Sequence, residues 1–169
     1  MKLISLLEKL EYTCLQGSTD QEVKNVVYDS RKVEEGSLFI CIRGAVVDGH
    51  KFVPDVVAKG AKVLIVEEAV EAPEDVTVIL VKDTRYAMAF ISAAYFGYPA
   101  EKLKTIGITG TKGKTTTTYM VKSILENAGY KVGLIGTIEA IIGDKVIPAK
   151  NTTPESYVCL LYTSDAADD

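Results

Sequence analysis

Residues 107–118 have the types and spacing best suited to chemistry; they read Gly-Ile-Thr-Gly-Thr-Lys-Gly-Lys-Thr-Thr-Thr-Thr. An apolar run typical of a strand, 103–108, leads into them, and a helical pattern over 115–128 follows. A strand, a glycine-rich turn and a helix bind phosphate, because successive backbone N–H groups and the helix N-terminus attract an anion. Gly110 and Gly113 would allow the backbone to approach that anion closely.

Two side chains complete this expected phosphate site. The Lys114 ammonium would reach the β and γ oxygens of a nucleotide, and the Thr115 hydroxyl would ligate Mg²⁺. The usual spacing, glycine and four residues before Gly-Lys-Thr, fails because residue 108 is Ile. Gly-Lys-Thr alone is a weak signal, and a plain strand–helix turn with a chance lysine is the alternative. The flanking strand and helix favour phosphate binding.

The elements that must position this loop fall into two groups, with a boundary near Pro99 to Lys102. The residues 97–99 (Gly-Tyr-Pro) break the preceding helix there. Before the boundary, helical patterns cover 2–10, 52–58 and 84–96, the last capped by Asp83, and strand patterns cover 23–28, 37–42, 63–66 and 76–81. After it we expect a strand at 103–108, the helix 115–128, a strand at 131–135, and a hairpin with arms 138–142 and 145–147 turning at Gly143-Asp144. The helix 115–128 carries a stripe expected to face a core, formed by Val121, Ile124, Leu125 and Ala128.

The expected fold class is therefore α/β, with a small mixed α/β domain over 1–99 and the start of a P-loop parallel-sheet domain over 103–158. This second domain is expected to be incomplete, because a parallel sheet needs several strand–helix units. We thus interpret the chain as the N-terminal part of a longer enzyme. The tail 159–169 ends in a small, acidic stretch, and we assign it no function.

Composition narrows the class of protein further. The chain has 169 residues, 47% hydrophobic and 25% charged, with a net charge of −4. It has no basic tract that would favour nucleic acid, and no apolar run near the roughly 18 residues of a membrane span. With no signal-peptide pattern either, we expect a cytoplasmic protein. Cys14, Cys41 and Cys159 lack metal-ligand spacing, so free thiols are expected, and the single His50 is expected to be structural.

Several segments together resemble the Mur ligase family over about residues 1–158. The segments 28–31, 36–40, 43–44 and 48–50 (Tyr-Asp-Ser-Arg, Gly-Ser-Leu-Phe-Ile, Arg-Gly and Asp-Gly-His) are similar to its uridine-nucleotide-binding N-terminal domain, and 83–85 with 87–89 to the last helix of that domain. Residues 107–117 resemble the family's ATP loop, which has the shorter Gly-Thr-x-Gly-Lys-Thr form. Residues 151–154 (Asn-Thr-Thr-Pro) resemble its muramoyl-peptide segment. Lys112 departs from the commoner Asn, and 159–169 do not continue the helix expected after Pro154.

The resemblance implies an ATP-dependent amide ligase of peptidoglycan precursor synthesis. Such an enzyme adds L-lysine or meso-diaminopimelate to UDP-N-acetylmuramoyl-L-alanyl-D-glutamate through an acyl phosphate. ATP and Mg²⁺ would bind at Gly110, Thr111, Lys112, Gly113, Lys114, Thr115 and Thr116, with Lys114 catalytic and Thr115 the metal ligand. The UDP-muramoyl-peptide would bind at Ser30, Asn151, Thr152 and Thr153. The acidic groups that complete such a site would lie downstream, so this part alone is expected to be inactive.

Local alternatives remain at three of these positions. Thr116 either contacts the α-phosphate or merely occupies the first helical turn. From its neighbours alone, Ser30 is a turn residue. Arg31 serves equally well as a diphosphate ligand or as the partner of a nearby carboxylate such as Glu34 or Glu35.

Two other functions compete with the ligase. A P-loop kinase or other ATPase, or a GTPase, would carry the full glycine spacing near the start of its domain, which this chain does not. A non-catalytic fragment that binds a UDP-sugar is the second alternative. The sequence indicates neither the oligomeric state nor the amino acid added.

Overall fold

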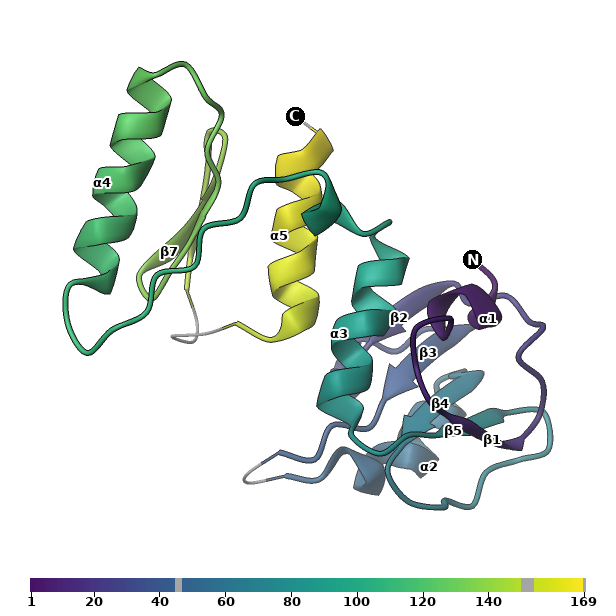
Figure 1. Ribbon diagram of the computed structural model, residues 1–169. Helices are drawn as coiled ribbons and strands as arrows, with labels where there is room; N and C mark the ends of the chain where they lie inside the picture. Colours follow the sequence, from purple (N-terminus) through teal and green to yellow (C-terminus); the bar gives the residue numbers. More distant parts are fainter. Residues whose placement is uncertain (45–46, 150–153, 169) are drawn as a thin grey trace. The chain divides into compact units, whose positions relative to one another are not determined.

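The computed structural model describes residues 1–44, 47–149 and 154–168. The chain forms two compact units, Met1–Tyr95 and Phe96–Asp169 (Figure 1). No helix of the described chain is both long and apolar enough to cross a membrane.

The first unit is built on a five-stranded sheet in the order β1-β5-β4-β3-β2. Strands β2 to β5 are parallel, and β1 pairs antiparallel with β5 at one edge. The strand bounds are Thr13–Gln16 (β1), Asn25–Val27 (β2), Ser37–Ile40 (β3), Val63–Val66 (β4) and Thr77–Leu80 (β5). The four parallel strands fall inside the predicted ranges, whereas β1 was not predicted.

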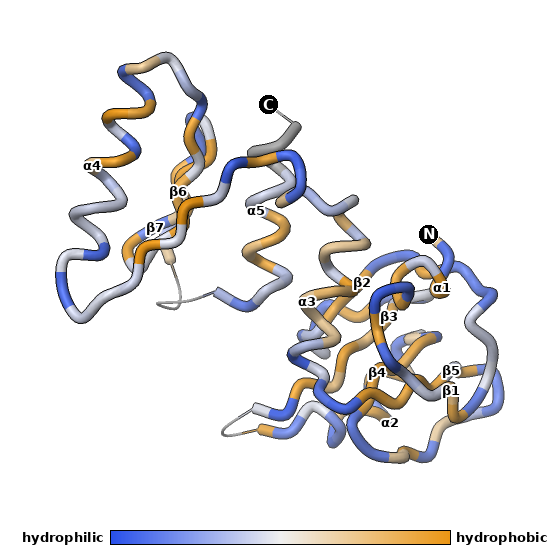
Figure 2. The backbone as a smooth tube through the Cα atoms, viewed as in Figure 1, coloured by the Kyte–Doolittle hydropathy of each residue, from blue (hydrophilic) through white to orange (hydrophobic). Residues whose placement is uncertain are grey.

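Helices cover both faces of this sheet, which explains why its central strands are apolar without alternation. The α2 helix, Val53–Ala58, packs on the face where Phe39, Leu64 and Val78 lie side by side in register. The helices α1, Leu3–Leu6, and α3, Thr84–Tyr95, lie on the opposite face (Figure 1). Figure 2 shows hydrophobic residues concentrated along the sheet strands, and every residue of β3 and β4 is buried.

Local signals begin and end the helices of this unit largely as predicted. The Asp83 Oδ1 atom accepts hydrogen bonds from the amides of Arg85 (2.8 Å) and Tyr86 (2.9 Å), which confirms the cap of α3. Gly60 follows α2 with φ +100, and a Cβ there would lie 2.8 Å from the Glu35 Cα, so glycine is required. Short 3₁₀ turns cover Ser30–Lys32 (η1) and Gly49–Phe52 (η2), and α1 is shorter than the predicted 2–10.

The second unit contains a three-stranded antiparallel sheet in the order β6-β7-β8. Its elements are η3 (Pro99–Glu101), α4 (Lys114–Asn127), β6 (Leu134–Ile135), β7 (Glu139–Ile142), β8 (Lys145–Pro148) and α5 (Ser156–Asp168). The predicted hairpin is confirmed, with a turn at Gly143 and Asp144 between β7 and β8. The helix predicted over 115–128 is also confirmed, and Gly129 follows it at φ +87.

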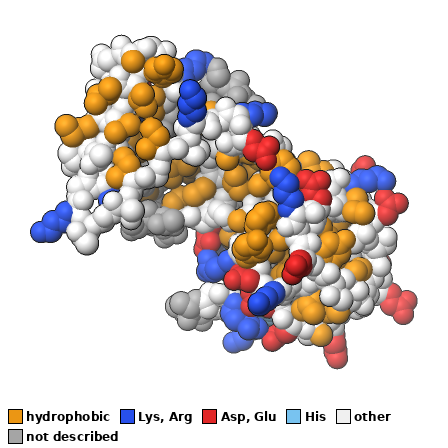
Figure 3. All heavy atoms as spheres, viewed as in Figure 1, with side chains coloured by type: hydrophobic (Ala, Val, Ile, Leu, Met, Phe, Trp, Pro, Cys, Tyr) orange, Lys and Arg blue, Asp and Glu red, His pale blue; other side chains and the backbone are white. Residues whose placement is uncertain are grey.

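Three expectations for this unit were wrong. Residues 103–108 form no strand, because no neighbouring strand pairs with them, and Ile106 is 64% exposed. The stripe of α4 is not buried, and Ile124 is 66% exposed; Figure 3 shows apolar side chains at the surface in this region. The described part of the tail, 159–168, is helical and continues α5 to Asp168, whereas we expected the helix not to continue there.

Candidate functional site

The predicted phosphate loop is an exposed turn that enters α4. Residues 109–114 are all exposed, and the helix begins at Lys114 with Gly113 as its N-cap. Gly110 (φ +151) and Gly113 (φ +79) both have backbone conformations that favour glycine. A Cβ on Gly113 would meet no atom within 4 Å, so open space adjoins the backbone where the helix begins. An anion could therefore approach the loop amides closely.

The Lys114 side chain folds back over this loop. Its Nζ atom donates a hydrogen bond to the Gly110 carbonyl oxygen at 2.6 Å, so the ammonium lies beside the same backbone. Its charge adds to the partial positive charge of the α4 N-terminus. Together these groups can hold and neutralise phosphate oxygens.

The threonines of the first turn differ in what their hydroxyls do. The Thr117 Oγ1 donates to the Gly113 carbonyl at 2.9 Å, and the Thr118 Oγ1 donates to the Thr115 carbonyl at 2.7 Å. Within the described part of the chain, the Thr115 and Thr116 hydroxyls make no such bond. The structure therefore brings residues 110–116 together and leaves the two predicted ligand hydroxyls available, which fits a nucleotide and its magnesium ion.

Ser30 follows β2 at the carboxyl edge of the parallel sheet, where ligands of such sheets commonly bind. Its carbonyl oxygen accepts a hydrogen bond from the Lys59 Nζ at 3.1 Å. The preceding Asp29 caps η1 by accepting from the Arg31 amide at 3.0 Å. This local bonding agrees with the alternative in which Ser30 is a turn residue.

Arg31 pairs with a nearby carboxylate, as one of the two alternatives held, and the partner is Asp29, not Glu34 or Glu35. Its Nε and one terminal nitrogen donate to the two Asp29 carboxylate oxygens at 2.9 and 2.8 Å. This fork holds the pKa of Asp29 at about 2. The guanidinium is nonetheless largely exposed. Asn151, Thr152 and Thr153 lie outside the described residues.

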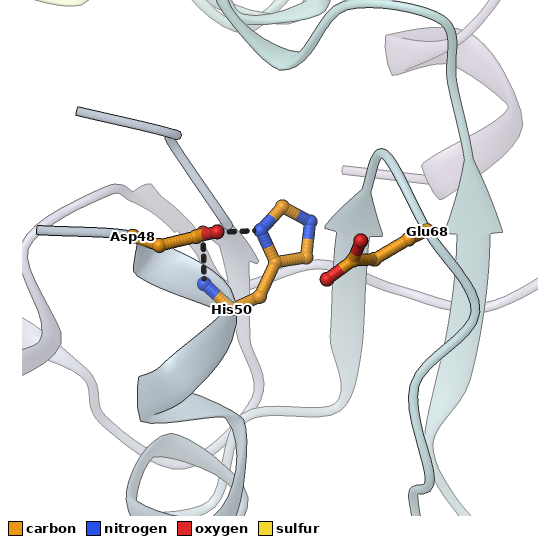
Figure 4. A group of neighbouring side chains, drawn as sticks. All are labelled: Asp48, His50 and Glu68. Atoms are coloured by element: carbon orange, nitrogen blue, oxygen red, sulfur yellow. Dashed lines mark hydrogen bonds and ion pairs between the residues drawn. The ribbon is translucent and has the colours of Figure 1, made fainter. Parts of the chain in front are cut away.

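A second polar group, which the sequence did not predict, surrounds His50 beyond the ends of β3 and β4. The His50 Nδ1 lies 2.6 Å from the Asp48 Oδ1 (Figure 4). Its Nε2 accepts a hydrogen bond from the Glu67 amide at 3.0 Å. The Nε2 atom must be unprotonated to accept, so the neutral ring carries its proton on Nδ1. The residue is only 8% exposed, in agreement with the structural role expected for it.

Arg43 connects this histidine to neighbouring carboxylates. Its guanidinium contacts Asp48 at 3.2 Å, Glu68 at 3.0 Å and Glu67 at 3.7 Å. The Glu67 Oε1 in turn accepts from the amide and hydroxyl of Thr84 at 2.8 and 2.7 Å, at the start of α3. The group thus joins the ends of two strands to a helix.

Asp48, His50 and Glu68 could each offer one metal-ligand atom, all within 4.8 Å of one another (Figure 4). Both ring nitrogens of His50 already have protein partners, however, and Glu68 is paired with Arg43. Hydrogen bonds from the amide and ring of His50 hold the pKa of Asp48 at about 2. We therefore assign this group a structural role and no metal.

An α/β unit with a parallel sheet, followed by a glycine-rich loop at a helix N-terminus, defines a nucleotide-binding class of protein. Comparison with known families narrows this class. The model described as "Mur ligase family, catalytic domain" matches residues 22–96, and the "Mur ligase middle domain" matches 108–169. Together they span more than half of the chain, which belongs to the Mur ligase family. The second match includes the tail that we had expected to fall outside the resemblance.

Curated relatives with high identity carry one name, UDP-N-acetylmuramoyl-L-alanyl-D-glutamate–2,6-diaminopimelate ligase. The protein of Clostridium perfringens (strain 13 / Type A) is 54% identical over 93% of this chain and 32% of its own length. That of Clostridium tetani (strain Massachusetts / E88) is 49% identical over 99% of this chain and 35% of its own. The chain thus spans about a third of the length of these relatives.

Solved structures agree with the family. A structure titled as the same diaminopimelate ligase has a TM-score of 0.76 over 99% of this chain and 34% of its own, at 22% identity, which shows the shared fold. The UDP-N-acetylmuramoylalanyl-D-glutamyl-2,6-diaminopimelate–D-alanyl-D-alanyl ligase of Acinetobacter baumannii has a TM-score of 0.58 at 35% identity, over 75% of this chain and 28% of its own. A MurF ligase of Thermotoga maritima, solved in complex with ADP, has a TM-score of 0.55 at 25% identity, over 83% of this chain and 29% of its own.

Proposed function

We propose that this chain is part of an ATP-dependent ligase that joins 2,6-diaminopimelate to UDP-N-acetylmuramoyl-L-alanyl-D-glutamate in peptidoglycan precursor synthesis. The observation that carries the proposal is the 54% identity, over nearly the whole chain, with the ligase named for that reaction. The names of the relatives favour diaminopimelate over L-lysine. A protein that uses ATP and a UDP-linked substrate works in the cytoplasm, which is the location we propose.

In this proposal ATP binds at residues 110–116. The loop amides and the Lys114 ammonium hold the β and γ phosphates, and Lys114 is the catalytic residue because it stabilises charge on the transferred group. The bond from its Nζ to the Gly110 carbonyl supports this role, since it already keeps the ammonium beside the loop. Mg²⁺ would neutralise charge on the phosphate oxygens, and Thr115, whose hydroxyl has no partner among the described residues, would be its ligand.

The uridine-linked substrate is proposed to bind the domain over 1–99 at Ser30, and to meet the ATP domain at Asn151, Thr152 and Thr153. Support for Ser30 comes from its position at the carboxyl edge of the parallel sheet. The reaction needs a substrate carboxylate to attack the γ-phosphate, which forms an acyl phosphate and releases ADP. The amine of the amino acid then displaces phosphate from the acyl phosphate and loses a proton, which forms the amide. This chain supplies the groups that position the phosphates for the first step.

Calorimetric titration of the 169-residue chain with UDP-N-acetylmuramoyl-L-alanyl-D-glutamate tests the substrate assignment. We expect saturable binding, weakened about fivefold in Ser30→Ala by the loss of one hydrogen bond of about 1 kcal/mol. Ser5→Ala, at an exposed position of α1, is the matched control and should bind like the unsubstituted chain. Absence of binding contradicts the assignment.

Turnover gives a second check on the same chain. We expect no ADP release that depends on added diaminopimelate, because the chain spans about a third of its relatives and the remaining catalytic groups are expected downstream. Binding of the UDP-linked substrate without any binding of ATP would favour a UDP-sugar-binding module instead.

A further inference from the structure

One side-chain contact joins the helix of the phosphate loop to the neighbouring sheet. The Tyr119 hydroxyl, on α4, donates a hydrogen bond to the Glu139 Oε1 at the start of β7, at 2.5 Å. The two residues are twenty positions apart in sequence. Elsewhere in the described chain, the side-chain hydrogen bonds of α4 stay inside the helix or reach back to the loop before it.

This contact matters because little apolar burial holds α4 in place. No residue of the helix is buried, whereas β6 and β7 bury Leu134, Ala140 and Ile142. A hydrogen bond to a charged acceptor that is partly shielded from water is stronger than one between neutral groups. Glu139 also raises the pKa of Tyr119, so the phenol keeps its proton and remains a donor.

The contact lies close to the phosphate loop along α4. Tyr119 follows Thr115 by four residues, so both side chains lie on one face of α4, one turn apart. Glu139 begins β7 and pairs across the hairpin with Pro148, the last residue of β8. The bond therefore links the helix that begins at the phosphate loop to the β7–β8 hairpin.

We propose that Tyr119 and Glu139 are positioning residues, whose hydrogen bond fixes the start of α4 relative to the β7–β8 hairpin and so holds Thr115 and the loop amides in place for ATP and its magnesium ion. This inference rests on the proposed function. The pair touches neither ligand and acts through Thr115 and the loop at one end and through the hairpin at the other.

Hydrogen exchange of the unliganded 169-residue chain tests the contact without any ligand. Tyr119→Phe removes only the hydroxyl, and we expect amides of 114–127 and 139–148 to exchange about tenfold faster. Glu139→Ala should have the same effect, and the double variant no further effect, because both remove one bond. Glu139→Gln keeps an acceptor oxygen and should retain most of the protection. Tyr130→Phe, at an exposed tyrosine that follows α4, is the matched control.

Affinity for ATP·Mg²⁺, measured by calorimetry on the same variants, tests the positioning role. We expect Tyr119→Phe and Glu139→Ala to bind about tenfold more weakly, and Glu139→Gln and Tyr130→Phe to bind normally. Unchanged exchange in Tyr119→Phe, additive effects, or an unprotected α4 in the unsubstituted chain would overturn the proposal. So would normal ATP affinity in Tyr119→Phe. A further outcome is that ATP binding is absent in the unsubstituted chain and in every variant, while Tyr119→Phe, Glu139→Ala and the double variant all speed exchange by the same factor. That result would contradict the proposed function and the positioning role, but it would confirm the contact between α4 and the hairpin.

Discussion

At the scale of single residues, Asp48 is the shared acceptor of the polar group around His50. Asp48 accepts hydrogen bonds from the amide and the ring of His50 and pairs with Arg43. The ring in turn accepts the Glu67 amide, and Glu67 accepts from Thr84. The loss of Asp48 therefore leaves several donors of one connected group without their acceptor.

We predict that Asp48→Ala lowers the free energy of unfolding by about 1.5–3 kcal/mol at pH 7, the range for hydrogen bonds to charged groups. Urea unfolding followed by circular dichroism measures the difference. Asp55→Ala is the control, because it removes only an exposed pair with Lys59 one helical turn away and should cost under about 0.5 kcal/mol. Equal losses in the two variants would contradict the structural role of Asp48.

The same aspartate predicts a pH dependence. Its folded pKa of about 2 lies below the ordinary aspartate value of 3.8, so its contribution is present above about pH 4 and is lost as the pH falls through about 2. The stability difference between the unsubstituted chain and Asp48→Ala should therefore shrink between pH 4 and pH 2. A difference that stays constant over this interval would show that the carboxylate charge is not what stabilises the group.

At the scale of elements, the sheet of the first unit carries the core. Leu64 is fully buried in the central strand β4 and lies in register between Phe39 and Val78. We predict that Leu64→Ala costs about 2–5 kcal/mol in urea unfolding, because it removes buried methyl groups and leaves a cavity. Leu15→Ala, on the partly exposed edge strand β1, should cost under about 0.5 kcal/mol. A small effect at Leu64 would mean that β4 is not central to the core.

The four parallel strands could be predicted because burial on both faces produces short, continuous apolar runs such as 63–66. The strand β1 could not, because Thr13–Gln16 is largely exposed and its pattern follows neither alternation nor continuity. At 103–108 a strand was predicted and the structure has none. This run has strand-like residues, but a strand also needs a neighbour to pair with, and sequence does not reveal one.

The residues of the candidate site also differ in whether the sequence could predict them. The residues 110–116 could be predicted because they are contiguous and their order alone indicates a phosphate loop. The polar group around His50 could not be predicted, because Asp48, Glu67 and Thr84 come from separate segments that only the sheet brings together. The bond between Tyr119 and Glu139 likewise depends on how α4 packs beside β7.

At the scale of the whole molecule, the division into two units implies that the first is stable by itself. Residues Met1–Tyr95 hold the five-stranded sheet, its covering helices and the polar group around His50. We predict that a chain of residues 1–95 keeps a cooperative urea transition, with the midpoint lowered by the same amount by Leu64→Ala as in the 169-residue chain. A non-cooperative transition in the shorter chain would contradict this division.

The central claim is that the loop 110–116 binds ATP with its magnesium ion, and calorimetric titration of the 169-residue chain with ATP·Mg²⁺ tests it most directly. We expect saturable binding that Lys114→Ala weakens at least about 30-fold, or about 2 kcal/mol, because a charged hydrogen bond to phosphate is lost. Lys104→Ala, at an exposed lysine that precedes the loop and lies outside 110–116, is the matched control and should change affinity far less. Equal losses in both variants, or tighter binding of GTP·Mg²⁺ than of ATP·Mg²⁺, would contradict the account.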